Sequence, residues 1–117
     1  QMNFEELSDK EILDIANPMM DNLMDASTEI DHPRHIQDFS DRMKEIVTKV
    51  RLQQMCENYQ AERGFFAARE TVAVFKRPES AAIVWKQFFT KAQGEFVAEM
   101  LLIHKNGRFL VEHTMVF

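Results

Sequence analysis

Two histidines near the C-terminal end of the chain have side chains suited to acid–base chemistry. His104 and His113 belong to a run of alternating apolar residues, which predicts that both lie on the core face of a sheet. An imidazole changes its charge near neutral pH, so it can serve as a general base or orient a ligand. We take His113 as the best catalytic candidate; the alternative is a partly buried histidine bonded to a neighbour. His104 is next to a turn, where a structural role at the rim is the simpler interpretation.

A second pair of histidines lies at the start of a predicted helix. His32 and His35 flank Pro33-Arg34, but a zinc site needs further ligands, and no Cys or third His is near them in the sequence. The single cysteine, Cys56, forms no internal disulfide framework, and the acidic Glu57 beside it does not favour a reactive thiolate. We therefore expect no metal and no other cofactor.

The C-terminal segment predicts a β-hairpin around Asn106-Gly107. This dipeptide suits a two-residue type I′ turn, because both central residues need a positive φ. A two-residue turn fixes the register. The predicted facing pairs are Lys105 with Arg108, Leu102 with Val111, and Met100 with His113.

The two faces of this hairpin predict two different roles. The core face would pack against helices, and it would include the lining of any pocket for a small apolar or amphipathic ligand. The candidate ligand-binding residues are Tyr59, Met100, Leu102, His113 and Met115. The opposite face is more apolar than a solvated face needs, which predicts a homodimer through the sheet unless a helix or the N-terminal segment covers it. The candidate dimer residues are Val97, Glu99, Leu101, Ile103, Leu110, Glu112 and Val116.

The elements before the hairpin complete an α+β domain. Helical periodicity predicts helices over residues 9–28, 32–47 and 49–63, and a period of two predicts strands over 66–76, 81–91, 95–105 and 108–117. Ser8 and Glu11 form a capping box at the first helix start. Pro18 either kinks this helix or starts a new one capped by Asn17, and we expect one kinked helix.

This order predicts a single domain, 1–117, in which N-terminal helices pack against a curved four-stranded antiparallel sheet. Residues 1–7 are a lead-in, 8–64 are helical and 65–117 form a meander. Gln1 precedes Met2, so either Gln1 is an addition or the natural chain began upstream and was trimmed.

Composition narrows the class of protein. The chain has 117 residues, 45% of them hydrophobic, and a formal net charge of −5, with the acidic excess in residues 1–64. An acidic chain without a basic cluster argues against nucleic-acid binding, which relies on Lys and Arg contacts to phosphates. No apolar run approaches the length of a membrane span. We expect a cytoplasmic protein, unless a signal peptide has been removed.

The element order and the ending, Lys105-Asn106-Gly107-Arg108-Phe109 followed by alternating residues, resemble the nuclear transport factor 2-like superfamily (SnoaL-like, cystatin-like cone). The resemblance covers about residues 8–117 and implies a cone-shaped pocket and frequent dimerisation through the sheet. It does not imply one reaction, because the superfamily includes isomerases, dehydratases, cyclases and binding modules. The early hairpin that is usual between its helices is missing here.

The resemblance also offers a test of catalysis. In ketosteroid isomerase-like members, a Tyr donates to an oxyanion and an Asp removes the proton. Tyr59 is the only tyrosine, and the predicted strands contain no Asp. We therefore expect a non-catalytic domain that binds a small apolar ligand or a protein partner. The alternatives are a dehydratase- or isomerase-type enzyme that uses His113, and a structural dimerisation module.

Overall fold

A computed structural model describes residues 2–117 of the chain, and Gln1 lies outside the described part. A short 3-10 helix, η1 (Phe4–Glu6), precedes four α-helices and four strands. The helices are α1 (Asp9–Glu29), α2 (His32–His35), α3 (Asp41–Ile46) and α4 (Lys49–Arg63). The strands are β1 (Phe66–Lys76), β2 (Ser80–Phe89), β3 (Phe96–Lys105) and β4 (Arg108–Val116).

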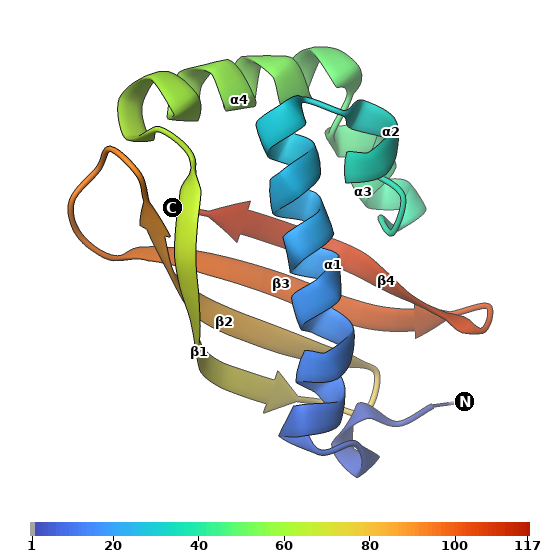
Figure 1. Ribbon diagram of the computed structural model, residues 1–117. Helices are drawn as coiled ribbons and strands as arrows, with labels where there is room; N and C mark the ends of the chain where they lie inside the picture. Colours follow the sequence, from blue (N-terminus) through green and yellow to red (C-terminus); the bar gives the residue numbers. More distant parts are fainter. Residues whose placement is uncertain (1) are drawn as a thin grey trace.

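The four strands form one antiparallel sheet in the order β1-β2-β3-β4, and the helices pack against one face of it (Figure 1). The predicted α+β class, with N-terminal helices on a four-stranded antiparallel sheet, is confirmed. Helix α1 crosses this face, while α2 and α3 lie toward the β4 side. None of the helices described in residues 2–117 combines the length and apolarity that crossing a membrane would take.

Side-chain caps determine where the helices begin. The Ser8 hydroxyl accepts from the Glu11 amide at 3.1 Å and the Glu11 carboxylate accepts from the Ser8 amide at 3.0 Å, which completes the predicted capping box. Helix α1 continues through Pro18, so the alternative restart at Asn17 does not occur. Thr48 caps α4, and Gly64, with a φ of 78°, ends it.

The single helix predicted over residues 32–47 is wrong, because it is broken into α2 and α3. The intervening Asp38–Ser40 stretch runs beside β4, where Phe39 and Val111 form an isolated parallel bridge. The Val111 amide donates to the Asp38 carbonyl at 2.7 Å, and the Ser40 amide donates to the Val111 carbonyl at 3.0 Å. Periodicity could not reveal this break, since it depends on a strand about seventy residues further along the chain.

The core lies between the helices and the sheet. Trp85, Met100 and Leu102 are at most 1% exposed there, and the indole N–H of Trp85 donates to the Asn17 side chain at 2.9 Å. Phe4, from the stretch that the sequence presents as a lead-in, is fully buried. The larger set of core side chains includes Ile12, Ala16, Met20, Leu52, Ile83, Ala98 and Val111.

A β-bulge changes the register of the C-terminal hairpin. Lys105 pairs with Arg108 and Leu102 with Val111, as predicted, but the register then shifts and Leu101 pairs with His113. The predicted pairing of Met100 with His113 is therefore wrong, since Glu112 is the extra residue on β4.

Because of this shift, the residues of β4 after Glu112 lie on the opposite face of the sheet from the one predicted. His113 and Met115 face away from the helices, contrary to the prediction, and Met115 is 52% exposed. Val116, predicted on the opposite face, instead pairs with the buried Ala98 and packs against the core.

Candidate functional site

The helices of residues 2–117 lie on one face of the sheet, and the opposite face is here called the outer face (Figure 1). The strand register groups its side chains in cross-strand rows. Its members are Ala73 and Phe75 of β1, Ala82, Val84 and Lys86 of β2, Val97, Glu99, Leu101 and Ile103 of β3, and Leu110, His113 and Met115 of β4. Phe117 extends it, because its backbone pairs with Val97. Phe75, Met115 and Phe117 are each more than half exposed.

Glu99 and His113 form the polar centre of the outer face. The His113 Nε2 lies 2.6 Å from the Glu99 Oε2, and both side chains are about one-third exposed. A carboxylate that orients an imidazole is a common arrangement in acid–base catalysis. Here the pair lies on an open sheet surface among Leu101 and Met115, so water has free access to it.

The other charged groups around the outer face also have partners. Lys86 pairs with Glu95 at 2.7 Å and lies across from Glu70. Glu112, which the sequence placed on this face, turns to the start of α3, where its carboxylate accepts from the Ser40 hydroxyl at 2.6 Å. The hydrogen bond from Ser40, with a smaller effect of Arg42, lowers the pKa of Glu112. The carboxylate is therefore ionised at neutral pH.

Both edges of the sheet are protected against pairing with another strand. On the β4 side, the Asp38–Ser40 stretch occupies the central part of the edge. On the β1 side, the register is interrupted between Phe66 and Arg69 and again between Thr71 and Ala73. Such bulges twist an edge strand and hinder the pairing of a further strand with it. The outer face is thus more accessible to a partner than either edge.

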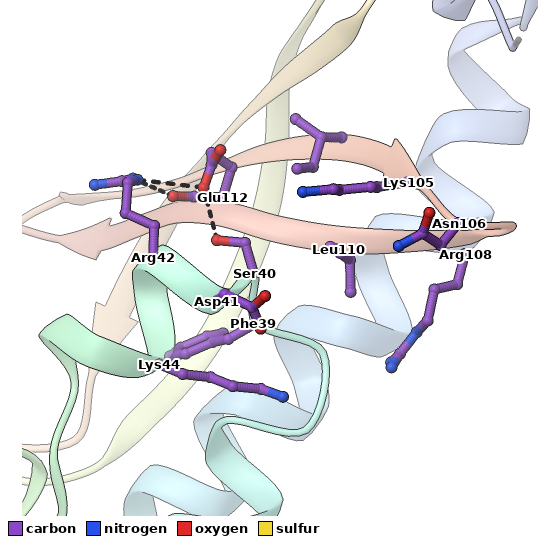
Figure 2. Close-up of a pocket in the computed structure, with 11 residues that line it drawn as sticks. Phe39, Ser40, Asp41, Arg42, Lys44, Lys105, Asn106, Arg108, Leu110 and Glu112 are labelled. Atoms are coloured by element: carbon purple, nitrogen blue, oxygen red, sulfur yellow. Dashed lines mark hydrogen bonds and ion pairs between the residues drawn. The ribbon is translucent and has the colours of Figure 1, made fainter.

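A separate pocket opens at the β4 edge between α3 and the tip of the β3–β4 hairpin (Figure 2). Its volume is about 320 Å³, and its lining combines basic and apolar side chains. The basic residues are Arg42, Lys44, Lys105 and Arg108. Sequence reasoning missed this site because the four residues are dispersed over two segments that only the Asp38–Ser40 pairing with β4 brings together.

Of the five residues predicted to bind a ligand, Tyr59, Met100 and Leu102 are part of the packed layer between the helices and the sheet, whereas His113 and Met115 lie on the outer face. Met100 and Leu102 are 1% and 0% exposed, and they pack against the helices. Tyr59 lies between α4 and the sheet, where its hydroxyl is 2.7 Å from the Ser27 Oγ. Burial raises the pKa of Tyr59 and also that of the neighbouring Cys56 thiol. The structure does not bring Tyr59 together with His113, because the two lie on opposite faces of the sheet.

The remaining histidines make local structural contacts. The His32 Nε2 lies 2.9 Å from the Val47 carbonyl, and His104 packs edge-on against Phe109. His35 is buried against Phe39, and burial lowers its pKa to about 4. Its Nδ1 has no hydrogen-bond partner in the described part of the chain.

Comparisons with known proteins show a likeness of fold. No family model matches the chain, and no curated protein matches its sequence. A SEC-C motif-containing protein from Rhodopseudomonas palustris is similar with a TM-score of 0.57 and 10% identity, over 88% of this chain and 89% of that chain. A DUF4783 family protein from Bacteroides uniformis has a TM-score of 0.51 and 10% identity, over 82% and 93%.

A third structure, Bd1075 of Bdellovibrio bacteriovorus, has a TM-score of 0.54 and 7% identity. The match covers 94% of this chain but 42% of that longer one. At such identities the likeness concerns the fold alone.

Proposed function

We propose that this chain is a non-catalytic association domain that forms a homodimer through the outer face. The observation that carries the proposal is the apolar outer face, which no helix of residues 2–117 covers, in a sheet whose two edges are both protected. Large exposed apolar patches on soluble domains commonly mark association sites. Phe75 and Met115, at opposite sides of the sheet, are 55% and 52% exposed, so the apolar surface extends across all four strands.

The size of the outer face is adequate for a stable interface. Four strands spaced at ~4.8 Å and about eight residues long, at ~3.3 Å each, present roughly 500 Å² in projection. Side chains that stand out of the sheet increase the accessible area beyond this projection. A stable interface buries ~800 Å² per partner, so most of the outer face would be needed.

The charges on the outer face are compatible with a second copy of itself. A two-fold axis brings each group near an identical surface, so unpaired carboxylates would repel. Glu99 is beside His113, Lys86 is beside Glu95, and Glu112 is directed toward Ser40 and Arg42. Two such faces can meet without leaving a carboxylate isolated.

A binding role for a small apolar ligand in the interior has less support. Met100 and Leu102 already contact the helices, so a ligand there would have to displace core side chains. Membership of the nuclear transport factor 2-like superfamily remains part of the proposal, and dimerisation through the sheet is what that resemblance implies.

An enzyme of the dehydratase or isomerase type is the second candidate, and the Glu99–His113 pair at 2.6 Å favours it. The pair could supply a general base, but its open position gives no exclusion of water. Activity against a panel of hydroxy-acyl and keto substrates that disappears with His113→Gln, while the fold and oligomeric state are kept, would establish this alternative in place of the non-catalytic role.

Leu101→Lys tests the dimer, because Leu101 lies in the central row of the outer face between Ala82 and His113. We expect the unaltered chain to be a dimer by light scattering at micromolar concentration and Leu101→Lys to be a monomer with an unchanged circular dichroism spectrum. Val50→Lys is the matched control, since Val50 is 66% exposed on α4 and far from the outer face. A monomeric unaltered chain, or a Leu101→Lys dimer, would disprove the proposed interface.

A further inference from the structure

The pocket beside the β3–β4 hairpin has a charge opposite to that of the whole chain. Four basic side chains line it, against two acidic ones, Asp41 and Glu112, whereas the chain has a formal net charge of −5. Such a local excess of positive charge in a concave site attracts anions and strengthens their binding.

Two of the four cations are held in place by carboxylates. Arg42 pairs with Glu112 at 3.2 Å, and Arg108 pairs with Asp38 at 2.9 Å and also donates to the Gln37 carbonyl. Arg42 donates in addition to the Glu112 carbonyl. These contacts connect α3 and the Asp38–Ser40 stretch to β4, and they keep the walls of the pocket in position.

The other two cations are available to a ligand. Lys44 and Lys105 form no ion pair within residues 2–117. Figure 2 shows Lys44 and Arg108 extending from opposite sides toward the space beside Leu110, while Lys105 extends along the hairpin toward Glu112. An anionic group in this space would meet the Lys44 ammonium and the Arg108 guanidinium, which come from two different elements.

The pocket also has an apolar component. Ile103 and Leu110, which face each other across β3 and β4, form part of its lining, and both are only partly buried. An inorganic anion gains no binding free energy from this apolar surface. A ligand with an apolar body does, because it removes Ile103 and Leu110 from contact with water. At about 320 Å³ the pocket is at the lower end of the range for small-molecule sites.

We propose that this pocket binds a small organic anion, in which a carboxylate or phosphate head lies beside Lys44 and Arg108, Lys105 strengthens the positive field around it, and a short apolar body covers Ile103 and Leu110. The site does not depend on dimerisation for its charge, because all four cations come from one chain. It shares Ile103 and Leu110 with the outer face, so this inference goes beyond the proposed dimer, and the ligand and the second copy would compete for these two side chains. It is distinct from the interior pocket expected from the sequence and from the Glu99–His113 pair.

Calorimetric titration with octanoate and octyl phosphate tests the site, and octylammonium and octanol serve as matched probes without the negative head. We expect the anions to bind at least tenfold more tightly than octylammonium. We also expect the double substitution Lys44→Ala/Lys105→Ala to weaken anion binding at least tenfold, with the effect reduced at high salt. Lys91→Ala, in the loop between β2 and β3 and so at the far end of β3 from the pocket, is the control and should leave binding unchanged.

The same titration on the Leu101→Lys chain separates this proposal from the proposed dimer. Binding that persists in this variant supports a site within one chain. Amide shifts from NMR that centre on Lys105, Leu110 and Lys44 would place the ligand. Equal binding of the four probes, shifts elsewhere, or unchanged affinity in the double variant would each overturn the proposal.

Discussion

Glu99 and His113 contact each other because β4 contains one extra residue, Glu112, between Val111 and His113. The bulge at Glu112 moves His113 from the core face to the outer face, where its Nε2 meets the Glu99 Oε2 at 2.6 Å. Without the bulge, His113 would face Met100 inside the core.

This contact should be measurable as a coupling between the two side chains. The Glu99→Gln and His113→Gln substitutions, alone and combined in the otherwise unaltered chain, form a double-mutant cycle. Since both groups are about one-third exposed, we expect a coupling free energy of up to ~1 kcal/mol by urea unfolding. Strictly additive effects would show that the two side chains do not interact in solution.

Leu102 should be among the most sensitive core positions of the sheet. It is fully buried between the sheet and the helices, so Leu102→Ala should lower the free energy of unfolding by ~2–5 kcal/mol. Val50→Ala, on the exposed side of α4, should change it by less than ~0.5 kcal/mol. A loss below ~1 kcal/mol at Leu102 would contradict the register of β3.

His35 should make the fold less stable as the pH falls from neutral. Its folded pKa is about 4, whereas an unfolded histidine titrates near ~6.5, so between these values the unfolded chain binds a proton that the folded chain does not. The free energy of unfolding should therefore decrease with falling pH, by up to ~1.4 kcal/mol per pH unit. Chemical unfolding at pH 7 and pH 5 should show a smaller decrease for His35→Phe. An identical decrease in both proteins would mean that His35 is accessible to protons in the folded state.

Glu112 should affect the free energy of unfolding in a lower pH range than His35 does. Because the Ser40 hydroxyl lowers its pKa, the stabilising effect is complete above the unfolded pKa of ~4.3 and disappears as the pH falls through the folded pKa. Glu112→Gln should lose stability relative to the unaltered chain at pH 6, and the difference should narrow toward pH 3. Glu79→Gln, at an exposed turn, is the control and should show no such convergence. A constant difference across this range would indicate that the charge of Glu112 is not involved.

Local signals were sufficient to predict most elements. The signals that start or end an element act on residues close to them in the chain, and the helix ends and the hairpin turn lie where the sequence predicts them. These signals are Ser8 with Glu11, Thr48, Gly64 and Asn106-Gly107. Alternating apolar residues predicted the core positions of β3 for the same reason.

Long-range contacts account for the errors. The tail Glu112-His113-Thr114-Met115-Val116 alternates almost equally well in either register, so its pattern does not reveal a bulge. The break between α2 and α3 depends on pairing with Val111, and the basic pocket depends on that break. Neither could be found by reading one segment at a time.

The pairing of the Asp38–Ser40 stretch with β4 also has a kinetic consequence. The Ser40–Glu112 contact joins residues 72 positions apart, so closing it costs more chain entropy than forming either neighbouring hairpin. Non-local contacts form slowly, and a short stretch paired to a sheet edge can open locally while the rest of the sheet stays folded. Each opening would release the backbone groups of Val111 and leave a strand edge free for intermolecular pairing. The rate of amide hydrogen exchange at Ser40 and Val111 therefore measures how often the folded chain is exposed to aggregation.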